Sequence, residues 1–167
     1  MSTTLHWVDG PWPGKLALAA RPRGGDWLVD EIANWDRAGV DSVFSLLTPE
    51  EENDLDLSNE AATVKGQGLK FTSFPIPDRQ VPLSEAKFAA ALEKLDGDLS
   101  AGQNVVVHCR QGIGRTGLIA ACLLVAKGLQ PAAAVSRASA ARGLPVPETA
   151  EQRKWIDHYA AVLAGTR

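Results

Sequence analysis

The chain has 167 residues, of which 45% are hydrophobic and 22% are charged, and its formal net charge is −3. This length predicts one domain spanning residues 1–167, and the composition excludes a disordered chain. The negative charge, without a compensating Lys/Arg cluster, argues against nucleic-acid binding, and no apolar run approaches the ~20 residues of a membrane-spanning helix, so no membrane segment is expected.

Apolar residues recur along the chain at spacings typical of short strands and amphipathic helices. Turn-rich segments at 21–25, 75–82 and 109–114 separate several of these runs. The predicted elements, in chain order, are strand 15–20, helix 27–37, strand 40–47, a short acidic helix from Thr48, a helix ending at Gly66, strand 69–74, a helix from Ser84, strand 104–107, and helices 115–127, 131–142 and 150–164.

Three predicted helices begin with a capping signature. Thr48 is followed three residues later by Glu51, Ser84 precedes an apolar helical face, and Thr149 is followed by Gln152. A side-chain oxygen at such a position accepts a hydrogen bond from a backbone N–H of the first turn that would otherwise lack a partner. These residues therefore predict where the three helices start.

The alternation of strands with helices indicates right-handed crossovers. The predicted fold class is α/β, with a mainly parallel central sheet of four to five strands and helices on both faces. In such sheets ligands bind beyond the carboxyl ends of the strands. Segments 21–25, 48–52, 78–82 and 109–114 are expected to emerge at that edge.

The segment after the last predicted strand combines a cysteine with an arginine that opens a helix. Unpaired N–H groups and the dipole of a helix start favour an anion, and phosphate suits such a loop. The same field stabilises a thiolate, so Cys109 is expected to be an ionised nucleophile. Arg115 can hold two phosphoryl oxygens through its planar fork. The expected phosphate-binding residues are Arg110, Gln111, Gly112, Ile113, Gly114 and Arg115.

Two neighbours of this loop are predicted to support it. His108 ends the strand and is expected to orient the cysteine loop, and the Thr116 hydroxyl is expected to hydrogen-bond the cysteine sulfur. Cys122 lies on an apolar helix and is expected to be a core residue. No cluster of ligand-type side chains accompanies the loop, so no metal and no cofactor are expected.

The ten residues from His108 to Gly117 match the signature of the cysteine-based phosphatases, which is His-Cys, five residues, Arg, Ser or Thr, Gly. The chain therefore resembles that superfamily, and its dual-specificity branch in particular. The resemblance implies that Cys109 attacks phosphorus, that a phosphocysteine forms and that water hydrolyses it without a metal. It assigns binding of the phosphoryl group and transition state to Arg115. Gln111 replaces the more usual alanine or glycine, which leaves the substrate preference open.

The family also uses an aspartate on a loop about thirty residues before the cysteine as its general acid and base. Asp78 lies in such a loop, at 75–82, and the context is similar to that of kinase-associated phosphatase and its bacterial relatives. The resemblance therefore implies that Asp78 protonates the leaving oxygen and later activates water. The alternative is an ordinary turn residue, because aspartate is common beside prolines.

The function expected from the resemblance is hydrolysis of phosphotyrosine in a phosphorylated protein substrate, with phosphoserine and phosphothreonine as further candidate substrates. Phosphate, vanadate or sulfate is expected to bind the loop. The start of the chain shows no secretion signal, so a cytoplasmic monomer with reduced thiols is expected. Three alternatives remain open: a phosphoprotein-binding module with weak turnover, a sulfurtransferase, and a phosphatase for phosphoinositides, RNA 5′ phosphates or sugar phosphates.

Four arginines near the expected site allow two interpretations. They either form a basic rim that attracts phosphorylated substrates or are ordinary solvated residues. They are Arg21, Arg23, Arg79 and Arg110.

Overall fold

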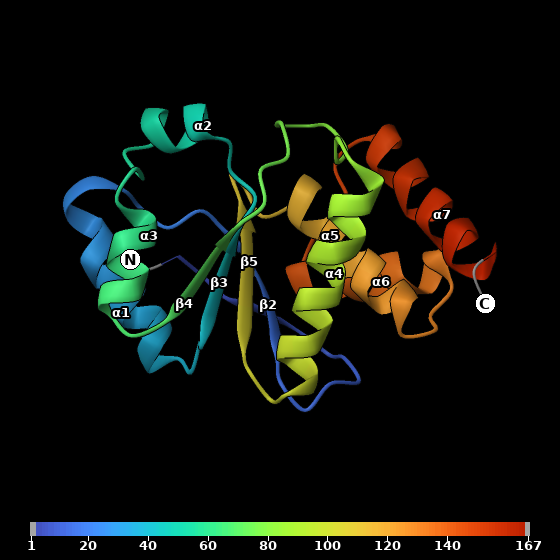
Figure 1. Cartoon of the computed structure of the whole chain (residues 1–167), viewed down its shortest axis with the longest axis horizontal. Helices are drawn as coiled ribbons and strands as arrows, with labels where there is room; N and C mark the ends of the chain where they lie inside the picture. The colour runs from blue at the N-terminus through green and yellow to red at the C-terminus, as the bar shows by residue number, and fades with distance from the viewer. Residues whose placement is uncertain (1–2, 166–167) are drawn as a thin grey trace.

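The computed structural model describes residues 3–165. Its centre is a five-stranded sheet in the order β1-β2-β5-β3-β4, in which β1 is antiparallel to β2 and the other neighbours are parallel (Figure 1). The strands are β1 (His6–Val8), β2 (Leu16–Ala20), β3 (Ser42–Ser45), β4 (Lys70–Ser73) and β5 (Val105–Cys109). The predicted α/β class with a mainly parallel sheet is confirmed.

Strand β1 was not predicted from the sequence. It contains three residues, which are too few to show an alternating pattern, and it is placed by pairing with β2 in the register His6↔Leu18 and Val8↔Leu16. The predicted strand 40–47 is longer than β3 at both ends, because only residues 42–45 pair with the neighbouring strands.

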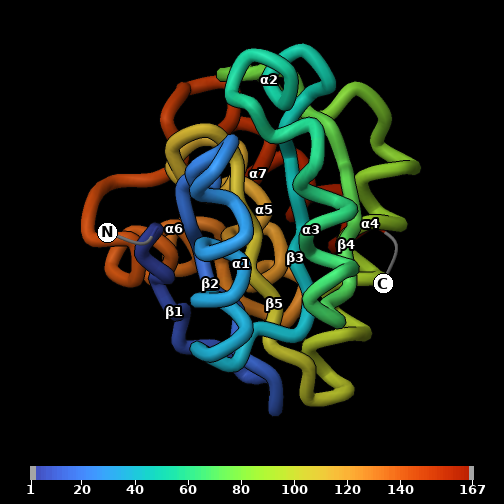
Figure 2. The backbone as a smooth tube through the Cα atoms, turned by 90° about the vertical axis from the view of Figure 1, so that its left-hand side faces the viewer, coloured from blue at the N-terminus to red at the C-terminus, as the bar shows by residue number. Residues whose placement is uncertain are grey.

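Helices cover both faces of the sheet, with α1 and α3 on one face and α4, α5, α6 and α7 on the other (Figures 1 and 2). A short 3₁₀ helix, η1 (Gly25–Trp27), precedes α1. The α-helices are α1 (Leu28–Arg37), α2 (Pro49–Asp54), α3 (Glu60–Gly66), α4 (Glu85–Ser100), α5 (Gly114–Ala126), α6 (Pro131–Arg142) and α7 (Ala150–Gly165). Among residues 3–165, no helix has the length and apolar character needed to cross a membrane.

The two cores follow from the alternation of side chains along β2. Leu16 and Leu18 point into the core that holds α4 to α7, whereas Ala17 and Ala19 belong to the core with Ile32 and other residues of α1. Helix α5 is buried along residues 114–125, as its apolar sequence predicts. A fully buried helix is a fixed support for the loop that precedes it.

The capping predictions are confirmed. Thr48 accepts a hydrogen bond from the Glu51 N–H at 3.3 Å, and Ser84 accepts one from the Lys87 N–H at 3.2 Å. Thr149 accepts one from the Gln152 N–H at 3.1 Å.

The parallel strands bring their carboxyl ends to one edge of the sheet. Ala20 pairs with Cys109 and Ser45 pairs with His108 in the strand registers. The Leu46 N–H donates to the His108 carbonyl at 2.9 Å, so the chain after β3 continues beside the cysteine. Helix α2 lies over this edge (Figure 2).

Candidate active site

The cysteine loop connects β5 to α5 and closes on its own sulfur. Cys109 is 3% exposed, and its Sγ accepts a hydrogen bond from the Gly112 N–H at 3.3 Å. Gly112 has a φ of +72°, and a Cβ at this position would lie 2.5 Å from the Ala19 carbonyl group. Glycine is required here both by the left-handed backbone and by the close approach to β2.

Arg142, in the last turn of α6, holds the outer side of this loop. Its Nε donates to the Gly112 carbonyl and its Nη2 donates to the Gln111 carbonyl, both at 3.0 Å. Because a trans peptide points its N–H away from its C=O, these bonds direct the N–H groups of Gly112 and Ile113 towards the opposite side. The Gly112 N–H does point at the cysteine sulfur. Only its place in the last turn of a predicted helix marked Arg142 in the sequence.

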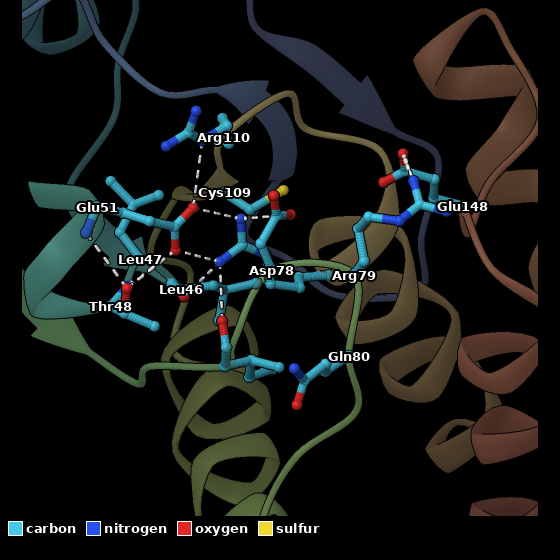
Figure 3. Close-up of polar contacts among 12 residues, drawn as sticks. Leu46, Leu47, Thr48, Glu51, Asp78, Arg79, Gln80, Cys109, Arg110 and Glu148 are labelled. Atoms are coloured by element: carbon cyan, nitrogen blue, oxygen red, sulfur yellow. Dashed lines mark hydrogen bonds and ion pairs between the residues drawn. The ribbon is translucent and has the colours of Figure 1, made fainter. Parts of the chain in front are cut away.

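Arg115 is 1% exposed and its guanidinium is held from several sides. Nη1 and Nη2 donate to the two carboxylate oxygens of Glu51 at 2.6 and 2.8 Å (Figure 3). Nη1 also donates to the Ile76 carbonyl at 2.8 Å, and Nη2 donates to Asp78 Oδ1 at 3.0 Å. Burial opposes the charge, but the hydrogen bonds that Arg115 donates to Glu51 and the neighbouring negative charges keep the pKa of Arg115 above its ordinary value.

Glu51 is a site residue that the sequence analysis treated only as a capping residue. Its Oε1 accepts from the Thr48 N–H at 3.1 Å, and the same carboxylate forms the ion pair with Arg115. Burial alone would raise the pKa of Glu51, but the hydrogen bonds from Arg115 and Thr48 and the Arg115 charge lower it to about 2. The cap of α2 therefore also positions the arginine of the loop.

Asp78 lies on the 75–82 loop and reaches the same site. Its side chain is 49% exposed and its Oδ1 bonds to Arg115. The next residue, Arg79, has a φ of +63° and forms an ion pair with Glu148 at 2.6 Å (Figure 3). Glu148 directly precedes the cap of α7, so this ion pair connects the Asp78 loop with the opposite wall of the site.

These groups surround one cavity of about 280 Å³, which we call the catalytic cavity. Cys109, Arg115 and Asp78, which come from three separate segments, all line it. Arg110 also pairs through its Nε with Glu51 at 3.4 Å. The lining residues are Asp78, Arg79, Cys109, Arg110, Gln111, Gly114, Arg115 and Glu148.

His108 lies beneath the loop and outside this lining. Its Nε2 is 2.6 Å from Glu60 Oε2, and both side chains are fully buried. Glu60 of α3 is therefore the ionic partner of His108, and the orienting role expected for His108 stays a prediction. Trp35 packs beside the imidazole, with 6.0 Å between ring centroids.

The expected hydrogen bond between Thr116 and the cysteine sulfur is not present. The Thr116 hydroxyl is fully buried and has no hydrogen-bond partner among the described residues. The hydrogen bond that the Cys109 sulfur accepts comes from the Gly112 N–H. Cys122 is a free, fully buried core residue as predicted, and burial raises the pKa of its thiol.

The described residues were also searched for a group of side chains that could bind a metal ion. Within residues 3–165, no three His, Cys, Asp or Glu side chains are grouped closely enough to hold a metal ion.

Residues 3–157 match the sequence profile of the family described as "Swiss Army Knife protein, DSP-PTPase phosphatase domain". The chain is 34% identical over 113 residues to a protein of Invertebrate iridescent virus 6 named as tyrosine phosphatase 197R, covering 64% of this chain and 41% of the relative. It is 27% identical over 128 residues to cyclin-dependent kinase inhibitor 3 of Sus scrofa, covering 75% and 60%. The chain thus spans less than two-thirds of the length of these relatives.

Solved structures share the fold at low sequence identity. A kinase-associated phosphatase whose catalytic-site cysteine is replaced by serine superposes with a TM-score of 0.89 at 21% identity, covering 98% of this chain and 97% of the other. PTPMT1 in complex with PI(5)P gives a TM-score of 0.75 at 17% identity, covering 96% and 98%.

Proposed function

The chain belongs to the Swiss Army Knife DSP-PTPase phosphatase domain family, and we propose that it hydrolyses phosphotyrosine, and phosphoserine or phosphothreonine, in proteins through a phosphocysteine on Cys109. The observation that carries this proposal is the meeting of Cys109, Arg115 and Asp78 in one cavity of about 280 Å³. A nucleophile, an anion-binding group and a proton donor are the three parts that the reaction needs.

Substrate binding uses the loop and Arg115. The phosphoryl oxygens accept hydrogen bonds from the loop N–H groups that Arg142 orients, and from the guanidinium that Glu51 holds in place. Nη2 of Arg115 donates hydrogen bonds to both Glu51 and Asp78 in this structure. In our proposal a phosphoryl oxygen takes that position at the guanidinium, which frees Asp78 to approach the leaving oxygen.

Two chemical steps follow. In the first, the Cys109 sulfur attacks phosphorus, the bond to the leaving oxygen breaks, and Asp78 donates a proton to that oxygen. In the second, the Asp78 carboxylate takes a proton from water, the water oxygen attacks phosphorus, and the sulfur–phosphorus bond breaks. The Gly112 N–H, 3.3 Å from Sγ, stabilises the sulfur that departs as a thiolate.

The relatives support a protein substrate. One carries the name of a tyrosine phosphatase and another that of a cyclin-dependent kinase inhibitor. We extend this to a phosphorylated protein as the partner of this chain, to phosphate, vanadate or sulfate as ligands of the loop, and to action as a monomer in the cytoplasm. Inhibition by vanadate is expected, and in the absence of vanadate chelators are expected to leave the activity unchanged.

Hydrolysis of an aryl phosphate tests the proposal. Cys109→Ser is expected to lower kcat by at least about 10³-fold, because serine is not ionised and nucleophilic at neutral pH. Cys122→Ala is the matched control, since it removes the other thiol from the core without touching the catalytic cavity. Full activity in Cys109→Ser would end the proposal. A panel of phosphopeptides, phosphoinositides and RNA 5′ phosphates then measures the substrate preference.

A further inference from the structure

Gln152, in the first turn of α7, is a fully buried side chain with hydrogen bonds at both ends of its amide. Its Oε1 accepts from the Glu148 and Thr149 N–H groups, each at 3.1 Å. Its Nε2 donates to the Gln80 carbonyl at 3.1 Å, although 72 residues separate the two positions in the sequence. The first end belongs to the cap of α7, whereas the second end reaches the loop that carries Asp78. Capping therefore accounts for only half of the bonds that this amide makes.

The same amide packs against the start of α5. A Cβ on Gly114 would lie 2.9 Å from Gln152 Oε1 and 3.1 Å from its Nε2, so a side chain at this position would displace the amide. Gly114 begins α5 and lines the catalytic cavity. Gln80 follows Asp78 by two residues on the other segment of the site (Figure 3). One buried side chain thus contacts both segments that supply catalytic groups, and it is not itself among the residues that line the cavity.

The loop that carries Asp78 is anchored on both sides of the acid. Before it, the Ile76 N–H donates to the Leu46 carbonyl at 3.1 Å, and the Ile76 side chain is fully buried. After it, the Gln80 carbonyl accepts the hydrogen bond from Gln152. The first anchor belongs to the core, so the second one decides how the far side of the loop is placed.

A further connection between this loop and the start of α7 is exposed to solvent. Arg79 forms its ion pair with Glu148 at 2.6 Å, and the two side chains are 62% and 31% exposed (Figure 3). Water and salt screen an ion pair at such exposure, whereas a buried donor that loses its acceptor is not readily satisfied by water. The hydrogen bond from Gln152 is therefore the stronger of the two constraints on the loop.

We propose that Gln152 is a positioning residue for the proton transfer, because it fixes the Asp78 loop relative to the cysteine loop. This inference rests on the proposed phosphatase function. The Asp78 side chain is bonded to Arg115 in the structure, and the proposed binding of a phosphoryl group removes that bond. The place of Asp78 then depends on the backbone of its loop. A general acid acts only within hydrogen-bond reach of the leaving oxygen, and a displacement of about 1 Å can lower the rate by about 10²-fold.

Gln152→Met tests the positioning role with esters of different leaving groups. Methionine is close to glutamine in length and carries no charge, but it cannot donate to the Gln80 carbonyl. We expect kcat for a poorly leaving alkyl phosphate to fall by about tenfold or more and kcat for an activated aryl phosphate to fall by less than about threefold, because the second ester hardly needs the acid. Equal losses for the two esters would overturn the proposal.

Thr149→Ala is the matched control for the cap of α7. It removes the hydroxyl that accepts from the Gln152 N–H and leaves the bond to the Gln80 carbonyl in place. Both rates should stay near those of the wild type. If Thr149→Ala reproduces the losses of Gln152→Met, the role of Gln152 lies in the cap alone.

A double-mutant cycle distinguishes an effect through Asp78 from a general loss of structure. On the alkyl phosphate, Gln152→Met should lower kcat by less than about twofold when Asp78→Asn is already present, because the group that it positions is gone. A loss that multiplies the loss caused by Asp78→Asn would contradict the proposal.

Hydrogen exchange separates this inference from the proposed function, since it needs no turnover. Peptides covering residues 75–82 should exchange about fivefold faster or more in Gln152→Met than in the wild type, and at the wild-type rate in Thr149→Ala. Gln152→Glu is a second variant: its carboxylate still accepts from the N–H groups of the cap but, when ionised, cannot donate to the Gln80 carbonyl, so exchange should be faster here too. Unchanged exchange at 75–82 in both Gln152 variants would overturn the inference even if the wild type hydrolyses both esters. A wild type that hydrolyses neither ester would instead refute the proposed function on which the inference rests.

Discussion

Glu51→Gln tests the ion pair that positions the arginine of the cysteine loop. The substitution keeps the size of the side chain and removes its negative charge. In the folded protein burial opposes ionisation of Glu51, yet the hydrogen bonds from Arg115 and Thr48 lower its pKa from 4.5 to about 2. The Glu51 and Arg115 side chains are 9% and 1% exposed, so solvent screens the pair only slightly.

The size of the effect follows from that pKa. One pKa unit is worth ~1.4 kcal/mol, so the change corresponds to about 3 kcal/mol of folding free energy at neutral pH. The amide of Gln keeps one oxygen as an acceptor for Arg115 and for the cap. We therefore expect Glu51→Gln to lower the free energy of unfolding at pH 7 by about 2 kcal/mol. Glu50→Gln, at the exposed neighbouring position in the first turn of α2, is the control and should cost less than ~0.5 kcal/mol.

The pH dependence adds a second readout. The folded-state pKa of Glu51 lies below the unfolded value, so its contribution is fully present above about pH 5 and is lost as the pH falls towards 2. The stability difference between wild type and Glu51→Gln should be about 1 kcal/mol smaller at pH 3.5 than at pH 7. Urea unfolding followed by tryptophan fluorescence measures this difference. Equal losses in Glu50→Gln and Glu51→Gln, or a difference that grows in acid, would refute the role given to this pair.

Three further predictions concern the loop and the acid. Asp78→Asn should lower kcat by about 10²-fold or more for a poorly leaving alkyl phosphate and much less for an activated aryl phosphate; an unchanged dependence on the leaving group would remove Asp78 from the proton transfer. Arg142→Gln should lower kcat on small aryl phosphates by about tenfold while unfolding by urea shows a folded protein, because two loop carbonyls lose their donors; wild-type kcat would contradict this. Gly112→Ala should destabilise the fold by about 2 kcal/mol or more in urea unfolding, given the positive φ and the 2.5 Å approach to Ala19, and a stable variant would show that β2 can move.

The parts of the fold that were predictable depend on short-range patterns. Thr48, Ser84 and Thr149 act on residues within one helical turn, and the capping bonds occur where the sequence places them. The cysteine loop was located for the same reason, because the motif occupies ten consecutive residues. Alternating strands and helices then restrict the topology to a mainly parallel sheet.

The parts that were missed depend on contacts between distant segments. Glu51 is 64 residues from Arg115, and Arg142 is 30 residues from Gly112. Neither pairing leaves a mark on local spacing, and the capping role of Glu51 already explained its presence in α2. The hydrogen bond expected for Thr116 was wrong because the direction of a hydroxyl within a helical turn cannot be read from sequence spacing.

Trapping the covalent intermediate tests the central claim most directly. Asp78→Asn should slow attack by water, so the enzyme mixed with an activated aryl phosphate and quenched in acid should carry one phosphoryl group. Peptide mass spectrometry is expected to locate that group on Cys109, and Cys109→Ser should carry none there. A phosphoryl group on another residue, or turnover without any labelled enzyme under conditions that give a burst of product, would contradict the account.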